Sequence, residues 1–320
     1  MLKIIRLNGY KMKKLPKMFQ SRKGWGEYFE IMRTQEPHVH QIEPTNHCPY
    51  TCVMCPRTKH MDRETGFMDM DLYRKVIDEI DTFQEPVRSK EIELFHFGES
   101  LIHPQLDEMI DYASKKGLNI VLSINPPSLD KKKIHGILDA NPSKIIISLD
   151  GHDSDSYKEI RGKHANYEKA LENIEELLNY HKKINSNSKI IIRMIEFNLN
   201  SPYSQKFKEQ WQRDGVEVEI REFFPWTEKE LVKLGKVQKW KPFMPCPFPW
   251  QYVVVQYNGD IVPCCRDYNG VNKIMNVKEH TLKEIWNSKE YADFRQQHIT
   301  GDYSGNDFCK ECMDIYYTEE

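Results

Sequence analysis

Residues 46–56 read NHCPYTCVMCP and place Cys48, Cys52 and Cys55 in a CxxxCxxC spacing. This short loop supplies three thiolates and no fourth. A cubane iron–sulfur cluster has four irons and is normally held by four cysteine thiolates. Three ligands therefore leave one iron free to bind something other than protein, and an open metal position indicates chemistry rather than a purely structural role.

Two other uses of these cysteines compete with a cluster. Structural zinc has four protein ligands, typically in paired CxxC motifs or CxxC with HxxxH. His47 and His60 lie nearby, but neither completes such a spacing. A disulfide framework is not expected, because a chain of 320 residues is long enough to build a core without covalent cross-links.

The composition limits the class of protein. A length of 320 residues suits one large α/β domain, alone or with a small appendage. The formal net charge of −2 gives no basic bias toward nucleic acid. No long apolar run or signal-peptide core is visible. We therefore expect a cytoplasmic protein without a membrane or nucleic-acid partner, whose clustered cysteines stay reduced as metal ligands.

Runs of β-type apolar residues alternate with amphipathic helical patterns along the middle of the chain. Strands are predicted at 39–44, 92–97, 119–124, 144–149, 189–195 and 216–222. Helices are predicted at 69–83, 104–116, 167–183 and 203–214. Asp69 or Asp71 is expected to cap the first of these helices, and Gly117 to end the second.

Six βα units imply a parallel sheet and an α/β fold. Right-handed crossovers would curl the sheet into a partial (β/α)6 TIM-like barrel. The loops at the carboxyl ends of the strands then gather on one face, where such folds bind their ligands. Because the cysteine loop directly follows the first strand, we expect a cluster on this face.

Composition also predicts three segments. Residues 1–36 form a basic N-terminal arm, because residues 1–23 hold eight Lys or Arg and no acid. Such a run is usually a solvated arm or mobile helix, and otherwise docks an acidic partner or substrate. The barrel is assigned to 37–228 and a small C-terminal domain to 229–320. A basic, helix-compatible connector at 229–241 precedes prolines that break regular helix.

The CxxxCxxC loop after a first strand resembles the signature of the radical S-adenosylmethionine (radical SAM) enzymes. In that family the free iron chelates the amino and carboxylate groups of SAM. The resemblance implies that Cys48, Cys52 and Cys55 hold a 4Fe-4S cluster, whose electron cleaves SAM to methionine and a 5'-deoxyadenosyl radical. That radical takes a hydrogen atom from a C–H bond. A low-potential electron donor, flavodoxin or ferredoxin, is expected as a partner.

The ends of the second and third strands carry residues that the resemblance assigns to SAM. Gly98 and Glu99 resemble the family's Gly-Gly-Glu segment, which holds the SAM ammonium, although Phe97 stands where the first Gly usually is. A Gly-Glu pair by itself is more often an ordinary turn. Ser123 and Asn125 resemble the turn that contacts the ribose in relatives.

The fourth strand continues this set of expected SAM contacts. Ser148 and Asp150 end that strand, and Arg161 follows where relatives have an arginine that pairs with the SAM carboxylate or faces the substrate. The planar guanidinium suits a carboxylate because it can donate two parallel hydrogen bonds, and the alternative is an exposed helix arginine. Tyr50 and Met54, inside the cysteine loop, are candidates for the adenine contact, or Met54 covers the cluster.

A second set of cysteines lies near the C-terminus: Cys246, Cys264, Cys309 and Cys312, with Gly259 between the first two. The pattern resembles the twitch domain, the shorter form of the SPASM domain of many radical SAM enzymes, and implies a second 4Fe-4S cluster. Four thiolates would equally satisfy zinc. The intervening residues predict a hairpin with strands at 252–256 and 261–263.

Cys265 is the one cysteine left without a ligand role. An uncoordinated thiol here could hand a hydrogen atom to a substrate radical, and the competing interpretation is a small buried apolar side chain. We therefore expect Cys265 and Arg161 to be the catalytic side chains. Arg266 and Asp267 could recognise polar substrate groups or form a surface pair. A dehydrogenation also needs a base, and four side chains are candidates for it: Arg161, Asp267, Glu99 and His96.

Relatives with this architecture oxidise or invert carbon centres in sugars and aminocyclitols, or modify ribosomally made peptides. The resemblance thus implies a radical SAM oxidoreductase or epimerase acting on a polar small molecule. A peptide substrate is the alternative within the family. A non-catalytic iron–sulfur scaffold is the alternative outside it, and the open cysteine loop together with Gly98 and Glu99 argues against it.

Overall fold

The computed structural model describes residues 16–223, 226, 233–234 and 243–316. The first fifteen residues of the basic arm and most of the predicted connector at 229–241 lie outside the described residues. Among the helices that are described, none is both long and apolar enough to cross a membrane.

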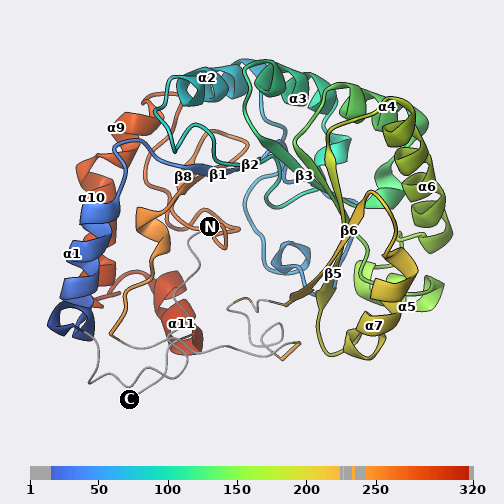
Figure 1. Ribbon diagram of the computed structural model, residues 1–320. Coiled ribbons are helices and arrows are strands. Elements are labelled where there is room, and N and C mark those ends of the chain that lie inside the picture. The colour runs from blue at the N-terminus through green and yellow to red at the C-terminus, as the bar shows by residue number, and fades with distance from the viewer. Residues whose placement is uncertain (1–15, 224–225, 227–232, 235–242, 317–320) are drawn as a thin grey trace.

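One curved sheet of eight strands forms the centre of the molecule, in the order β6-β5-β4-β3-β2-β1-β7-β8 (Figure 1). Its strands are β1 Val39–Ile42, β2 Ile92–Glu93, β3 Ile120–Ile124, β4 Lys144–Ser148, β5 Lys189–Glu196, β6 Val216–Glu222, β7 Val253–Val255 and β8 Ile261–Val262. Neighbours from β6 to β7 pair in parallel, and β7 and β8 pair antiparallel. The parallel sheet and the C-terminal hairpin are therefore both confirmed.

Strand β2 is much shorter than predicted. The sequence indicated residues 92–97, whereas regular pairing ends at Glu93. Leu94 N still donates to the carbonyl of Val121 in β3 at 2.8 Å, whereas the backbone N–H of Phe97 donates to a side chain, Glu43 Oε1, at 3.2 Å. The residues after Leu94 thus belong to a loop, which the alternation of side chains cannot distinguish from a strand.

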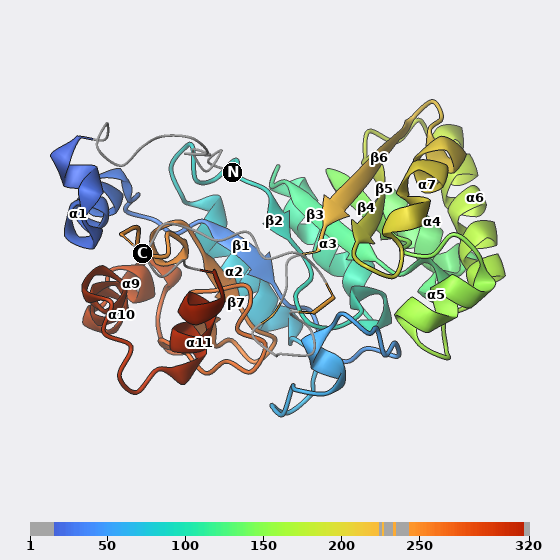
Figure 2. The same ribbon diagram turned by 90° about the horizontal axis from the view of Figure 1, so that it is seen from below.

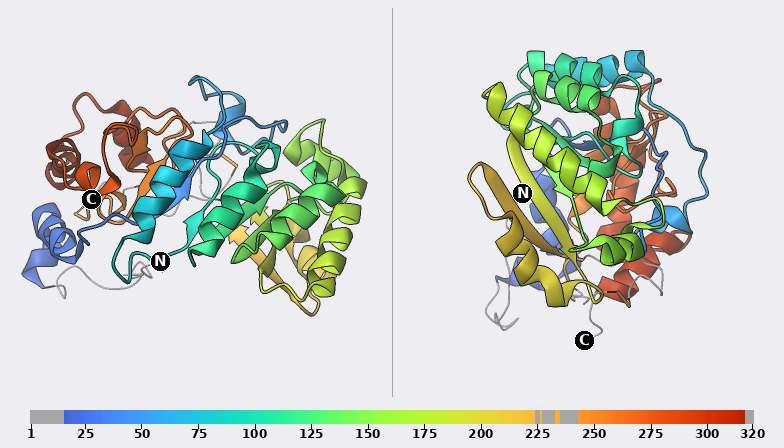
Figure 3. Two further views of the ribbon diagram at one scale, coloured as in Figure 1. Left: turned by 90° about the horizontal axis from the view of Figure 1, so that it is seen from above. Right: turned by 90° about the vertical axis from the view of Figure 1, so that its right-hand side faces the viewer.

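Helices cover the convex side of the sheet (Figures 1 and 3). The described helices are α1 Arg22–Met32, α2 Met70–Asp81, α3 Leu106–Lys115, α4 Lys131–Asp139, α5 Ser154–Arg161, α6 Tyr167–Lys183, α7 Ser204–Trp211, α9 Leu282–Trp286, α10 Lys289–Thr300 and α11 Asp307–Tyr316. Asp69 caps α2 by accepting from the N–H groups of Asp71 and Leu72, as predicted. Alternate residues of the strands, such as Ile92, Ile120 and Ile147, pack under these helices in one apolar core.

The basic N-terminal segment is only partly an arm. Residues 22–32 form α1, which packs against α10 at one end of the molecule (Figure 2). A Cβ on Gly26 would lie 2.5 Å from Ile299, which shows how closely the two helices approach. Trp250 Nε1 donates to Glu30 at 2.6 Å. The expectation of a solvated arm is wrong for α1, because its aromatic face is buried against the C-terminal part of the chain.

Candidate functional site

The loop with the first three cysteines follows β1 and is held against α5. Val53 N donates to the carbonyl of Ile160 at 2.9 Å, and Arg57 Nη2 donates to the carbonyl of Cys48 at 2.9 Å. Cys52 is buried, and Cys48 and Cys55 are partly buried. All three pack in one small apolar cluster around Met54. The loop therefore gathers its three sulfurs beside the carboxyl ends of the strands.

Without a metal, burial disfavours the thiolate form of these three cysteines. It raises the pKa of Cys48 and of Cys55 to about 12, and it also raises the pKa of Cys52. A bound metal reverses this effect because its positive charge stabilises the thiolates. In the part of the chain that is described, no three His, Cys, Asp or Glu side chains converge on a single metal ion. A cubane spreads its ligands over separate irons, and the donor set of three clustered thiols fits one.

Gly98 and Glu99 lie directly against the cysteine loop. Glu99 N donates to the carbonyl of His47 at 2.8 Å. Gly98 has φ +146°, and a Cβ there would come within 2.2 Å of the carbonyl oxygen of Thr45. Only glycine fits this position without moving the backbone. The Gly-Glu pair thus brings the end of β2 into contact with the predicted cluster loop.

Four predicted residues form one buried polar chain across the ends of β2, β3 and β4. Glu99 Oε2 accepts from Asn125 N at 3.0 Å and from Asn125 Nδ2 at 2.5 Å. Asn125 Oδ1 accepts from Arg161 Nη1 at 2.6 Å, and Arg161 forms an ion pair with Asp150. Asp150 Oδ1 accepts from the N–H of Ile195 at 2.7 Å, which ties the chain to β5.

Arg161 is the member of this polar chain that contacts the cysteine loop. Its Nη1 lies 3.7 Å from Cys52 Sγ, so it is a buried arginine and not the exposed helix arginine of the alternative interpretation. Its Nε is buried and has no hydrogen-bond partner. A buried donor without a partner is costly, and a carboxylate such as that of SAM would satisfy it. This orphaned donor fits the predicted SAM site, and its role there stays a prediction.

The remaining predicted SAM contacts lie around the same strand ends. Ser123 Oγ and Ser148 Oγ are 3.2 Å apart on neighbouring strands. Tyr50 OH lies 2.8 Å from Ser128 Oγ. Met54 is buried, and its carbonyl accepts from Trp226 Nε1 at 2.8 Å. Contact of these four residues with SAM stays a prediction.

The sequence analysis missed Glu43, a fully buried carboxylate just after β1. It accepts from both Nη atoms of Arg63, at 2.8 and 2.5 Å, and from the N–H of Tyr257 at 3.2 Å. Burial alone would raise its pKa, but hydrogen bonds from His96 and Arg63 outweigh burial and lower the pKa to about 2. The sequence signal that could have identified Glu43 is an acidic residue directly after a buried strand.

The second cysteine set comes together between the hairpin and α11. Cys264 follows β8, Cys309 and Cys312 lie on α11, and Cys246 precedes the hairpin. Burial, and next the nearby thiol of Cys312, raises the pKa of Cys246 to about 12. Arg266 bridges two of these cysteines, through its N–H to Cys264 Sγ and its Nη1 to Cys312 Sγ, both at 3.4 Å. The topology thus gathers four thiols from separate segments, as a cluster requires.

Cys265 lies beside Cys264, and their two thiols are in hydrogen-bond contact. Cys265 Sγ accepts from Tyr252 OH at 3.3 Å, and Cys265 packs beside Val254 and Val262. Its carbonyl accepts from His96 Nε2 at 2.9 Å. The apolar contacts suit a small buried side chain, and the role of hydrogen-atom donor stays a prediction.

The structure contradicts one alternative for Arg266 and Asp267 and shows the surroundings of two base candidates, Asp267 and His96. Arg266 and Asp267 are both buried, so they do not form a surface pair. Asp267 accepts from the N–H groups of Val271 and Asn272, at 2.9 and 2.7 Å, and so stabilises a turn. His96 Nε2 donates to the carbonyl of Cys265, and its Nδ1 lies 3.4 Å from Glu43 Oε1.

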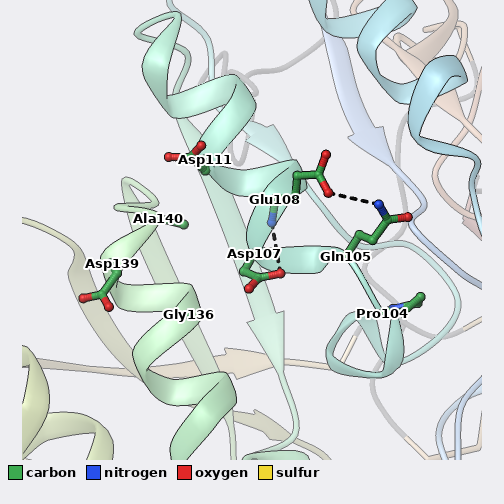
Figure 4. Close-up of a pocket in the computed structure, with 8 residues that line it drawn as sticks. All are labelled: Pro104, Gln105, Asp107, Glu108, Asp111, Gly136, Asp139 and Ala140. Atoms are coloured by element: carbon green, nitrogen blue, oxygen red, sulfur yellow. Dashed lines mark hydrogen bonds between the residues drawn. The ribbon is translucent and has the colours of Figure 1, made fainter.

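One surface pocket lies away from these residues. It is lined by residues of α3 and α4 and their flanks, among them Asp107, Glu108, Asp111 and Asp139 (Figure 4). None of the predicted site residues lines it.

The sequence matches two family models. The model of the radical SAM superfamily matches residues 42–197, and the SPASM model, an iron–sulfur cluster-binding domain, matches residues 246–313. The chain is a radical SAM protein with a C-terminal SPASM domain. This confirms the predicted family and, with the parallel sheet, the predicted fold. The two domains imply SAM and iron–sulfur clusters as cofactors, and the count of two 4Fe-4S clusters stays a prediction.

Several characterised proteins resemble this radical SAM protein along most of its length. It is 22% identical over 289 residues to the S-adenosyl-L-methionine-dependent 2-deoxy-scyllo-inosamine dehydrogenase of Niallia circulans, covering 88% of this chain and 94% of that protein. It is also 22% identical to the tungsten-containing aldehyde ferredoxin oxidoreductase cofactor-modifying protein of Pyrococcus furiosus, covering 79% and 82%.

Solved structures share the fold at low identity. BtrN in complex with AdoMet and 2-DOIA superposes with a TM-score of 0.53 at 17% identity, covering 85% of this chain and 91% of that one. Streptococcus suis SuiB bound to S-adenosylmethionine gives 0.57 at 14% identity, covering 84% and 70%. Native anSMEcpe with bound AdoMet gives 0.58 at 13%, covering 88% and 91%. At such identities these likenesses show the fold alone.

Proposed function

We propose that this radical SAM protein dehydrogenates an alcohol carbon of a polar small molecule, a sugar or an aminocyclitol. The observation that carries the proposal is the end-to-end similarity to an aminocyclitol dehydrogenase, which covers 88% of this chain and 94% of that protein. The four gathered C-terminal thiols support it, since they are sufficient for one auxiliary cluster.

The residues that would hold the cofactors are those at the strand ends. Cys48, Cys52 and Cys55 would hold a 4Fe-4S cluster, and Arg161 Nε is free to meet the SAM carboxylate. When bound, cluster and SAM together supply a 5'-deoxyadenosyl radical that removes a hydrogen atom from substrate. Asp150 and Asn125 fix the guanidinium of Arg161 in place, so the chain's own contribution is orientation and exclusion of water.

The proposed reaction is a two-electron oxidation of the substrate. The alcohol carbon would lose a hydrogen atom to the 5'-deoxyadenosyl radical, which becomes 5'-deoxyadenosine. The hydroxyl would lose a proton to a base, and one electron would leave to a one-electron acceptor, which gives a ketone. We assign that acceptor to a 4Fe-4S cluster on Cys246, Cys264, Cys309 and Cys312. The electron that cleaves SAM comes from flavodoxin or ferredoxin.

Epimerisation is the second candidate, and a thiol that the four-cysteine set does not require favours it. The thiol of Cys265 lies beside that of Cys264 and accepts a hydrogen bond from Tyr252 OH. Transfer of its hydrogen atom to the opposite face of the substrate radical would invert the carbon with no net oxidation. The sulfur radical left behind would then need one electron and one proton, the electron from the same low-potential donor.

The test uses anaerobically reconstituted full-length protein with SAM, dithionite and panels of polyols, aminocyclitols and peptides. We expect 5'-deoxyadenosine and a ketone in equal amounts from a small molecule, in the wild type and in Cys265→Ala. In deuterated water, an epimerase would place deuterium at the inverted carbon, and Cys265→Ala would lose this incorporation. That result would contradict dehydrogenation and support epimerisation. Turnover of a peptide alone would overturn the substrate class. If no panel yields 5'-deoxyadenosine, the protein is a non-catalytic scaffold and the proposed function is wrong.

A further inference from the structure

Arg266 touches two of the four cysteines assigned to the auxiliary cluster. Its backbone N–H donates to Cys264 Sγ and its Nη1 donates to Cys312 Sγ, each at 3.4 Å. The two sulfurs come from different elements, the loop after β8 and helix α11. One residue thus supplies hydrogen bonds to both sides of the cysteine set.

The guanidinium of Arg266 is held in this position. The residue is 5% exposed. Its carbon Cζ lies 4.2 Å from the ring centroid of Tyr316 and 5.8 Å from that of Trp226, and Nη2 donates to Tyr316 OH. Two aromatic faces and a hydroxyl therefore fix the charge beside the sulfurs, and the side chain has little freedom to swing toward solvent.

A fixed buried cation beside cluster ligands has a defined electrostatic effect. The reduced form of a cluster carries one more negative charge than the oxidised form. Positive charge and N–H···S hydrogen bonds stabilise the more negative form, and both act strongly where solvent screens little. The hydrogen bonds also orient the ligands. Arg266 therefore favours the reduced cluster over the oxidised one.

We propose that Arg266 is a positioning residue that raises the reduction potential of the auxiliary cluster and so makes it a better acceptor for the substrate electron. The proposal rests on the proposed function, in which the C-terminal cysteines hold that cluster. It predicts that loss of the charge shifts the cluster toward its oxidised form at any fixed potential.

The experiment is an EPR-monitored redox titration of the full-length chain with Cys48, Cys52 and Cys55 changed to alanine, so that only the auxiliary cluster is present. In Arg266→Gln we expect at least a tenfold higher oxidised-to-reduced ratio at the wild-type midpoint, a shift of about 59 mV for a one-electron couple. Arg266→Lys keeps the charge but loses the planar fork, and its midpoint should lie between the two.

Arg295 offers a matched control. It is also a buried arginine of the C-terminal region, but it donates to the carbonyls of Pro249 and Trp286 and its guanidinium lies 4.3 Å from the ring of Trp286. In Arg295→Lys, the oxidised-to-reduced ratio at the wild-type midpoint should stay within twofold of the wild-type value.

The outcomes separate the two proposals. An auxiliary cluster that is present with the same midpoint in Arg266→Gln overturns the inference alone. If Arg266→Gln does not assemble a cluster, Arg266→Lys decides, and an unchanged midpoint there overturns the inference. A wild-type auxiliary site that holds only zinc overturns the proposed electron acceptor, and with it this role for Arg266.

Discussion

His96 Nε2 donates to the carbonyl oxygen of Cys265 at 2.9 Å, which joins the loop after β2 to the loop after β8. The other ring nitrogen of His96 faces Glu43, which in turn holds Arg63 and the N–H of Tyr257. Arg63 Nε also donates to the carbonyl of Tyr268 at 2.6 Å. The radical SAM domain and the SPASM domain therefore share one buried network centred on Glu43.

Removing the first cysteine set should halve the iron content. In the triple variant of Cys48, Cys52 and Cys55 to alanine, we expect reconstituted iron to fall from about eight to about four per chain, with no 5'-deoxyadenosine formed. Colorimetric iron and sulfide assays and chromatography of nucleosides measure this. Cys265→Ala is the control and should keep all of its iron. Complete iron loss in the triple variant would contradict two independent clusters.

Adding one methyl group at Gly98 should impair SAM binding. The new Cβ would meet the carbonyl oxygen of Thr45 at 2.2 Å. The loop that carries Glu99 must then move away from the cysteine loop, so we expect Gly98→Ala to weaken SAM binding at least tenfold, about 1.4 kcal/mol. Calorimetry with the reconstituted protein measures this affinity.

Gly117→Ala is its matched control. Gly117 also has a positive φ, +74°, but a Cβ there meets nothing within 4 Å. We expect a stability loss of about 1 kcal/mol and unchanged SAM affinity. Equal losses of affinity in both variants would mean that the close approach at Gly98 is unimportant.

Replacing Glu43 with glutamine should destabilise the whole molecule. The change leaves the guanidinium of Arg63 without its buried counter-charge, at an expected cost of about 3–5 kcal/mol in the free energy of unfolding. Denaturant titration followed by circular dichroism measures it. Glu91→Gln is the control, because the Glu91 side chain is 52% exposed and its pair with Lys144 should contribute below about 1 kcal/mol.

The pH dependence of stability should carry the signature of Glu43. Its pKa falls from 4.5 to about 2 on folding. A lowered folded pKa contributes stability that is fully present above pH 4.5 and is lost as the pH falls toward 2. We expect the stability gap between wild type and Glu43→Gln to narrow over this window. A constant gap from pH 6 to pH 3 would show that the carboxylate charge is not its source.

Local patterns predicted most of the fold and the cysteine sets. Helix α6 and strand β6 begin and end at the predicted residues, because each is a long segment with one clear periodicity. The roles of Glu43 and Arg266 could not be read from the sequence, since their partners lie up to 214 residues away. The residues of α1 were assigned by charge alone, and the aromatic face that buries them was overlooked.

The parallel pairing of β1 with β7 constrains how this protein can be divided. Val253 N donates to the carbonyl of His38, and Glu43 N donates to that of Val255, both at 2.9 Å. A chain cut before β7 would leave β1, with its apolar residues, as an unprotected edge open to pairing with other molecules. Truncation there should yield aggregates instead of a smaller catalyst. Attempts to exchange the C-terminal domain between relatives should therefore carry β1 along with it.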